Sequence, residues 1–473
     1  MKKIIVFFVF YKLIFAYELP LVVKQEILKG NFIRAKYLID SIVCFSNLDA
    51  IAKWNLNFEK EKLDRISLDF NKKIDDILPY IKQYLPNIKE EEIKDFEKDK
   101  SLEMMFINGE KKYFYNADKN LFRVNKKLRD IKNNPFPNTT SGYKIDTYQA
   151  IPFLLSEFNK WNKRYLNPIK ITLKYSVILK DGIVPEGEIV RGWFPFPKEN
   201  QRQKNVKLLS CNADRFIIED TKNPHRSIYF EKRVEKNKPL VFEYSISYLS
   251  FAEVNKIDFT KDIKYDFSND TLLKEFVKES PPHIVFSDKI RELSNKIVGN
   301  ETKKLKIVKK IYQWIDENIP WASAREYSTI DCIPEYVIDN MHGDCGQVSL
   351  LFITLCRLNG IPAKWQSGWM IHPNEINLHD WAEIYIPDYG WVPVDQSFGI
   401  HNFENEEQKF FFLGSLDNYH LTVNDDISRN FYPLKVYPRS ETVDFQRGEL
   451  EWRGGNIYFN NWKYNMEIKY GEK

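Results

Sequence analysis

A block from 343 to 395 constrains this chain most, because one helical pattern and several strand patterns follow each other there without a long gap. Apolar residues recur at helical spacing directly after Cys345, and Asn359-Gly360 ends that pattern. Alternating residues, which are typical of half-buried strands, come next. The predicted strands are 363–371, 380–386 and 391–395. The block therefore predicts a helix followed by an antiparallel sheet.

Cys345 falls at the predicted start of the helix. Asp344 is a natural N-cap, since its carboxylate can accept the free amide hydrogens of the first turn. The helix dipole and the unpaired N–H groups at this end stabilise a thiolate. Gly343 and Gly346 leave space beside the sulfur for a substrate carbonyl. We predict that Cys345 is a reactive thiol, and that Cys356, further along the helix, is a buried structural cysteine.

The stretch 378–385, which includes His379, also reads as a strand, and the short loop 387–390 joins it to the strand 391–395, which ends in Asp395. A carboxylate beside an imidazole can hold it in one tautomer and stabilise its charged form. A regular hairpin would place Asp395 opposite Ala382, so a bulge or a shifted turn is expected to bring it to His379. Asp380 points to the other face of the strand, and we expect it to matter little for the chemistry.

The order of these residues resembles the transglutaminase-like superfamily, bacterial secreted type. The resemblance covers residues 285–400, and three motif blocks carry it: His342–Gln347, His379–Tyr385 and Tyr389–Asp395. It implies a cysteine-protease-like fold, in which a helix bearing the cysteine packs on an antiparallel sheet. It also implies a catalytic triad in which Cys345 is the nucleophile, His379 the base and Asp395 the orienting acid. This chemistry needs no metal and no organic cofactor.

The resemblance leaves the activity open among several kinds of relative. Members include protein cross-linking acyltransferases, peptidases, amidases and non-catalytic relatives. Eukaryotic cross-linking members carry tryptophan directly after the nucleophile, where this chain has Gly346. We therefore expect hydrolysis of a protein, peptide or other amide substrate, with cross-linking and a non-catalytic binding role as alternatives. Trp321 is a candidate second oxyanion donor through its indole N–H, or else a core aromatic.

The remaining chain predicts a multidomain α+β protein. Asn108-Gly109 indicates a hairpin, and the segment 191–197 is too rich in proline for a central strand. His372 and His401 are expected at the surface or in loops. The predicted parts are a signal peptide at 1–16, a mainly helical region at 17–150, a β-sandwich at 168–250, the catalytic domain at 285–400 and a β-rich extension at 405–473.

Charge and the N-terminus suggest where the protein acts. The net charge of +4 arises from 70 basic and 66 acidic residues, which argues against nucleic acid as a partner. Lys2 and Lys3 precede the apolar run 4–15, which ends at Ala16. This pattern is typical of a secretory signal peptide, with a buried N-terminal helix as the alternative. No later stretch approaches the ~20 apolar residues of a membrane span, so we expect a secreted or periplasmic protein.

Overall fold

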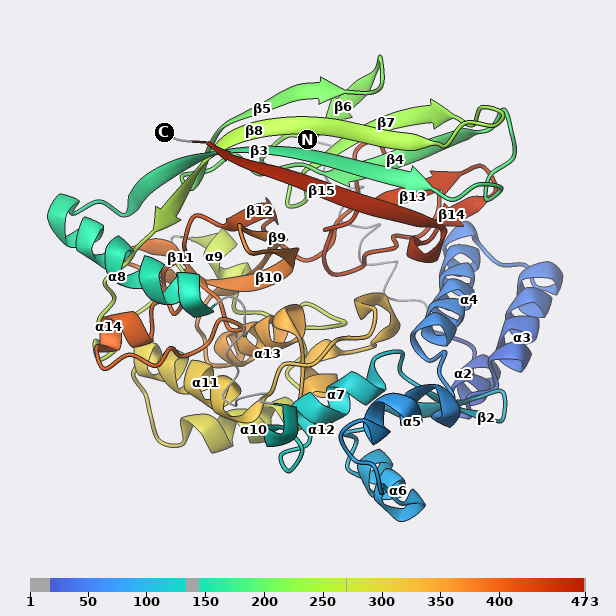
Figure 1. The fold of residues 1–473 in the computed structure, drawn as a ribbon, viewed down its shortest axis with the longest axis horizontal. Coiled ribbons are helices and arrows are strands. Elements are labelled where there is room, and N and C mark those ends of the chain that lie inside the picture. Colours follow the sequence, from blue (N-terminus) through green and yellow to red (C-terminus); the bar gives the residue numbers. More distant parts are fainter. Residues whose placement is uncertain (1–17, 133–143, 269, 472–473) are drawn as a thin grey trace. The chain divides into compact units, whose positions relative to one another are not determined.

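The computed structural model describes residues 18–132, 144–268 and 270–471 (Figure 1). The chain divides into two compact units. The first consists of Met1–Phe136, Ser280–Val285 and Pro320–Asp344, and the second of Pro137–Glu279, Phe286–Ile319 and Cys345–Lys473. No helix among the described residues is long and apolar enough to cross a membrane. The predicted signal peptide at 1–16 lies outside the described residues.

The first unit is mainly helical, as the apolar spacing predicts. Its helices are α2 (Leu21–Leu28), α3 (Phe32–Phe45), α4 (Ala50–Asp69), α5 (Ile74–Lys82), α6 (Glu90–Lys98), α7 (Ala117–Val124) and α12 (Ile333–Asn340), with short 3-10 turns at Asp130–Lys132 and Tyr327–Thr329. The predicted hairpin is confirmed. Strands β1 (Met104–Ile107) and β2 (Glu110–Tyr113) pair around Asn108 and Gly109, whose φ angles are 51° and 83°. Asparagine and glycine tolerate this left-handed backbone.

Two sheets of the second unit (Figure 1) share one apolar core, to which the third sheet, described below, also contributes. Their orders are β15-β3-β8-β5 and β14-β13-β4-β7-β6. The strands are β3 (Tyr165–Leu179), β4 (Ile189–Pro195), β5 (Gln203–Cys211), β6 (Phe216–Ile218), β7 (Ser227–Arg233), β8 (Val241–Glu253), β13 (Glu449–Trp452), β14 (Gly455–Ile457) and β15 (Trp462–Gly471). Strands from the end of the chain thus complete both sheets, whose other strands come from residues 165–253. The domain boundaries given above stay predictions.

Strand β4 corrects the expectation for the proline-rich segment 191–197. It is the central strand of the five-stranded sheet, between β13 and β7. The pairing with β13 covers Arg191 to Trp193 and ends before Pro195, the last residue of the strand. Proline is tolerated there because no ladder hydrogen bond from its nitrogen is needed at a strand end.

A third sheet of the second unit, ordered β11-β10-β9-β12, carries the predicted site. Its strands are β9 (Ala363–His372), β10 (Glu375–Ile386), β11 (Gly390–Val394) and β12 (His420–Asn424). Helix α13 (Cys345–Leu358) packs against β10 and β9. The other helices of this unit are α8 (Lys144–Trp161), α9 (Thr271–Glu275), α10 (Asp288–Val298), α11 (Lys304–Asn318) and α14 (Glu406–Lys409), with a 3-10 turn at Phe459–Asn461. A cysteine-bearing helix on an antiparallel sheet confirms the predicted α+β core.

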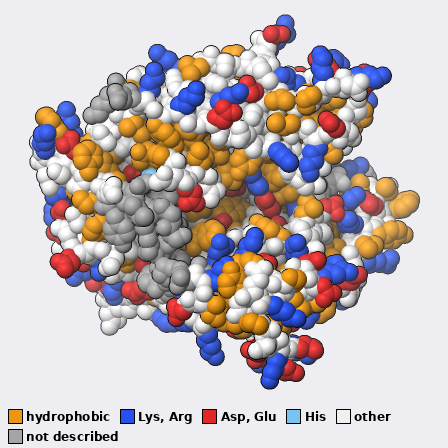
Figure 2. Space-filling model, in the orientation of Figure 1, with side chains coloured by type: hydrophobic (Ala, Val, Ile, Leu, Met, Phe, Trp, Pro, Cys, Tyr) orange, Lys and Arg blue, Asp and Glu red, His pale blue; other side chains and the backbone are white. Residues whose placement is uncertain are grey.

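Basic and acidic side chains are interspersed over the face of the molecule drawn in Figure 2. The sequence contains 70 basic and 66 acidic residues, so neither sign dominates the chain.

Candidate active site

Cys345 is the first residue of α13. Its side chain is half-buried, whereas the helix behind it is almost entirely buried from Gly346 to Arg357. The Sγ atom lies 3.7 Å from Oδ2 of Asp380 in β10. Cys356 is fully buried in the same helix, and burial raises the pKa of its thiol. Of these two cysteines, Cys345 combines exposure with the helix start that favours thiolate chemistry.

His379 and Asp395 form a buried pair in the sheet. The Nε2 atom of His379 lies 2.7 Å from Oδ2 of Asp395. Of the two expected arrangements, a bulge or a shifted turn, the structure shows the shifted turn. The ladder is regular but shifted by one residue, with Gly390 opposite Ile386 and Val394 opposite Ala382. Asp395 follows Val394 directly, so it lies opposite Trp381. Trp381 is two residues from His379 and on the same face of the strand, which places Asp395 within reach of His379.

Both oxygens of the Asp395 carboxylate are engaged. Oδ1 accepts the backbone N–H groups of Ser397 and Phe398 at 3.0 and 3.1 Å. Oδ2 receives His379 and also Nε2 of His420, at 2.9 Å. Burial raises the pKa of this carboxyl, but the two imidazoles outweigh that effect and hold it well below its usual range. Asp395 therefore stays anionic to a lower pH than an ordinary carboxyl does.

His420 was missed by sequence reasoning. It is the first residue of β12 and is fully buried. Its Nδ1 atom lies 2.8 Å from Oδ1 of Asp417, so two carboxylates flank the ring. Burial lowers its pKa, but Asp417 and Asp395 together raise it. The only available signal was the histidine itself at the start of a short alternating stretch, and nothing in that stretch links it to the distant Asp395.

Asp380 corrects the expectation that it lies apart from the chemistry. Its carboxylate contacts Sγ of Cys345 through Oδ2 and accepts Nε2–H of Gln446 through Oδ1, at 2.6 Å. The same amide donates to the backbone oxygen of His379 at 2.8 Å. Alternation does turn Asp380 away from His379, but the other face of the strand is also occupied by site residues. Pattern alone could not show what covers that face.

Other predicted residues fall as follows. His372, the last residue of β9, and His401, in the loop before α14, are buried, at 4% and 5% exposed. A surface position is therefore wrong for both, whereas the expected loop is right for His401. The rings of Tyr419 and Phe412 pack against these two histidines, at centroid distances of 4.7 and 5.3 Å respectively.

Trp321 belongs to the first unit and is half-buried. The guanidinium of Arg123, in α7, lies 4.6 Å from the centroid of its ring. A backbone bridge joins Trp321 to Gly343 in the same unit. Its role as an oxyanion donor stays a prediction.

The nitrogen and oxygen atoms of His379, Asp395 and His420 lie within 4.8 Å of one another, which raises the question of a metal ion. The N···O distances of 2.7 and 2.9 Å are hydrogen-bond lengths. Ligands of a tetrahedral zinc, each about 2.0–2.1 Å from the ion, would lie roughly 3.3 Å apart. Direct hydrogen bonds therefore describe this group better than shared metal ligation does.

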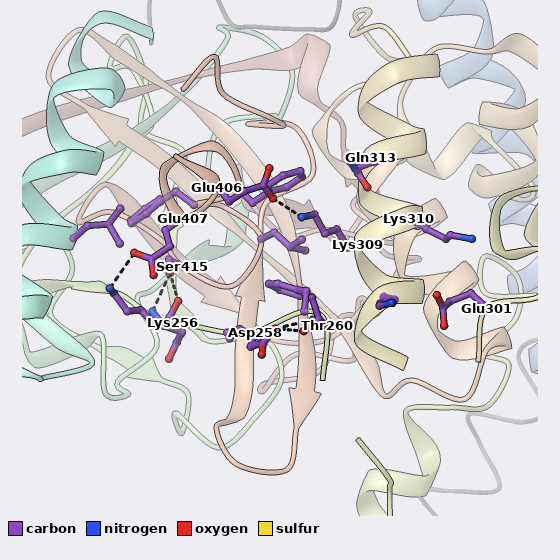
Figure 3. Close-up of a pocket in the computed structure, with 18 residues that line it drawn as sticks. Lys256, Asp258, Thr260, Glu301, Lys309, Lys310, Gln313, Glu406, Glu407 and Ser415 are labelled. Atoms are coloured by element: carbon purple, nitrogen blue, oxygen red, sulfur yellow. Dashed lines mark hydrogen bonds and ion pairs between the residues drawn. The ribbon is translucent and has the colours of Figure 1, made fainter. Parts of the chain in front are cut away.

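A cavity of about 660 Å³ elsewhere in the second unit is lined by groups that neutralise each other (Figure 3). Lys256 pairs with Glu407 at 2.9 Å, and Lys309 with Glu406 at 2.6 Å. The triad residues are absent from its lining. This cavity is separate from the site on the third sheet.

Comparison with known families identifies the domain that holds this site. Residues 291–396 match the transglutaminase-like superfamily, so the chain carries a transglutaminase-like domain. The match lies within the 285–400 span of the predicted resemblance and confirms it. It includes all three residues of the predicted triad.

Curated relatives and solved structures cover larger parts of the chain. An uncharacterised protein of Haemophilus influenzae is 24% identical over 254 residues, 46% of this chain and 66% of that protein. The uncharacterised protein YebA of Bacillus subtilis is 24% identical over 163 residues, 28% of this chain and 22% of its own length. The chain thus spans less than two thirds of either relative.

Two solved structures are similar at low identity. One, described as a proposed cysteine protease from Cytophaga hutchinsonii, has 16% identity and a TM-score of 0.44, covering 65% of this chain and 91% of its own. The periplasmic domain of TgpA from Pseudomonas aeruginosa has 14% identity and a TM-score of 0.25, covering 48% and 88%. At these scores the domain assignment rests on the family match.

Proposed function

We propose that the protein is a cysteine-dependent hydrolase of amide bonds, with a protein or peptide as its substrate. One observation carries the proposal. The imidazole of His379 is held by the buried carboxylate of Asp395, and the next residue along the strand, Asp380, contacts Sγ of Cys345. Nucleophile, base and orienting acid therefore come from one helix end and two neighbouring strands, within the domain that the family match covers.

The hydrogen bond to Asp395 assigns the two nitrogens of His379 different tasks. Nε2 is engaged by the carboxylate, which leaves Nδ1 as the nitrogen that exchanges a proton with the Cys345 thiol. The thiolate attacks the amide carbonyl, and the carbon–nitrogen bond breaks as Nδ1 gives its proton to the leaving amine. A thioester to Cys345 remains. Water, deprotonated by the same nitrogen, then releases the acid and restores the thiol.

The developing oxyanion needs hydrogen-bond donors. The backbone N–H of Cys345, at the first position of α13, is the first candidate, because the amides of the first helical turn point toward the start of the helix. Gly346 follows where cross-linking relatives have tryptophan, and this favours water over an amine as the acceptor. The signal-like N-terminus supports action outside the cytoplasm, in a secreted or periplasmic protein.

The test is alkylation by iodoacetamide, followed by mass spectrometry of the labelled peptides, in wild type and in Cys345→Ala. We expect Cys345 to be labelled below the unperturbed thiol pKa of about 8.5, and Cys356 to be labelled slowly because it is buried. Cys44→Ser is the matched control, since Cys44 is exposed in α3 of the first unit. Equal labelling of Cys345 and Cys356 in the folded protein would contradict the proposal.

A peptide library, with and without a primary amine such as cadaverine, then separates hydrolysis from transfer. Hydrolysis gives products that gain water and ignore the amine, whereas transfer gives products that carry it. Products of either kind must disappear in Cys345→Ala and persist in Cys44→Ser. Products that persist in Cys345→Ala would show that another group performs the chemistry.

A further inference from the structure

A second histidine is bonded to the carboxylate of the proposed triad. Nε2 of His420 lies 2.9 Å from Oδ2 of Asp395, the same oxygen that Nε2 of His379 approaches to 2.7 Å. Asp417 holds the other nitrogen of His420 at 2.8 Å. We propose that His420, anchored by Asp417, is a positioning residue that fixes Asp395 for its work on His379. This inference rests on the proposed function of Cys345, His379 and Asp395.

The sheet order explains how the two histidines reach one oxygen. Strand β9 lies between β10 and β12, and its Gly368 is opposite His379 while its Met370 is opposite His420. Opposite residues share a face, and so do residues two apart, so both imidazoles project from the same face. Their ring centroids are 5.3 Å apart.

Gly368 allows the close approach of β12. A Cβ atom at this position would lie 1.9 Å from the backbone oxygen of Leu421, a distance that real atoms do not reach. Any other residue would therefore push β12 away from β9. Because β12 begins with His420, the displacement would carry the imidazole away from Asp395.

The two histidines and two carboxylates of this cluster are buried together. His420, Asp395, Asp417 and His379 are at most 5% exposed, and the rings of Phe398, Phe412 and Trp381 pack around His420. Arg202 also faces this segment, with Nη2 donating to the backbone oxygens of Asp417 and His420 at 2.8 and 3.4 Å. Its charge is directed at the backbone, so the protons on His420 are shared between the two carboxylates.

This arrangement gives His420 two effects on the proposed reaction. Its N–H fills the second acceptor position of Oδ2, so that the Asp395 carboxylate cannot rotate away from His379. Both of its ring nitrogens face carboxylate oxygens, which only accept, so the ring donates from both nitrogens and carries positive charge beside the pair. The two carboxylates accordingly raise its pKa against the effect of burial. Loss of the N–H should lower turnover, and loss of the charge should move the pH profile.

Two substitutions separate these effects. His420→Leu removes both, and kcat on a peptide substrate should fall roughly 10- to 100-fold with little change in KM, as for other residues that orient a catalytic group. His420→Gln keeps an amide N–H that can reach Asp395, and it should recover most of kcat. In both variants the alkaline limb of the pH profile should move to higher pH, because the neighbouring cation is gone.

The controls keep the outcomes distinct. His225→Gln changes another buried histidine, bonded to the backbone of Asp426, and should leave kcat and the pH profile unchanged. If His420→Leu does not fold, His420→Gln still tests the alkaline limb. Wild-type kcat and an unmoved alkaline limb in folded His420 variants would overturn the inference. Stoichiometric zinc in the purified wild type, lost in His420→Leu, would also overturn it.

The inference about His420 can be wrong while the proposed function is right. If Cys345→Ala is inactive while the His420 variants behave as wild type, only the role of His420 is wrong. If Cys345→Ala retains full turnover, the proposed function itself is wrong.

Discussion

Two successive residues of β10, His379 and Asp380, meet different partners. The His379 side is closed: Asp395 and His420 are fully buried there and bonded to each other. On the Asp380 side the carboxylate meets the half-buried thiol of Cys345 at 3.7 Å, longer than the bonds of the first side. The comparison teaches that the base is held by a fully buried carboxylate, whereas the nucleophile lies at a partly exposed helix start, where a substrate carbonyl can reach it.

Removal of the His379 imidazole should have the largest effect on turnover. In His379→Ala the thiolate loses both its ion-pair partner and the proton donor for the leaving amine, so turnover should fall by on the order of 10⁴ or more. Steady-state kinetics on a peptide substrate, with folding checked by circular dichroism, measures the effect. His225→Ala is the control for loss of a buried imidazole. Turnover near that of the wild type would remove His379 from the mechanism.

Asp395→Asn should have the next largest effect on turnover. The amide keeps the size of the side chain but can donate to Nε2 of His379, which favours the wrong tautomer. In a serine triad the analogous change costs on the order of 10⁴ in kcat, and we expect up to that loss here. Asp388→Asn, in the exposed turn between β10 and β11, is the matched control. Equal kcat values for the two variants would contradict the assignment.

Asp380→Asn tests the contact between the Asp380 carboxylate and the Cys345 thiol. Its carboxylate lies beside Sγ of Cys345, and a nearby negative charge disfavours the thiolate. Its removal should therefore speed alkylation of Cys345 by iodoacetamide near neutral pH by up to about tenfold, with a smaller change in kcat. If alkylation is unchanged while kcat falls as far as in Asp395→Asn, Asp380 would be the orienting acid, and the roles of the two faces would be exchanged.

The smallest effect concerns acid stability. The pKa of Asp395 is depressed in the folded protein, chiefly by His379 and His420 acting against burial. Such a group adds stability that is fully present above its unfolded pKa of about 3.9 and is lost as pH falls through the folded value. Urea unfolding at a series of pH values should show a flatter acid limb in Asp395→Asn than in the wild type. Parallel limbs would mean that Asp395 is not stabilised as an anion.

Local patterns predicted much of the site. Helical spacing after Cys345 and alternation around His379 depend on neighbours in sequence, and these elements formed where expected. The register between β10 and β11 is harder to predict. A shift of the turn by one residue changes which residues lie opposite each other, while the same residues stay in the two strands. His420 could not be found because its role depends on β9 lying between two strands, which no local pattern encodes.

The position of a strand within its sheet also could not be predicted from local patterns. Proline in β4 suggested an edge, but its place at the strand end satisfies the backbone even in the centre of the sheet. Gln446 lies far along the chain, yet it donates to both His379 and Asp380. These contacts depend on tertiary packing, which overrides local preference.

The pairing of β15 with β3 has a consequence for how the chain is made. The ladder runs from Trp462 to Gly471, along a strand that begins some three hundred residues earlier. A ribosome delivers β3 long before β15, so the nascent sheet carries an open edge throughout synthesis of the residues between them. Because β13 completes the other sheet in the same way, a chain interrupted before its last strands leaves two unpaired edges. Such an unfinished chain is a natural target for chaperones and for degradation.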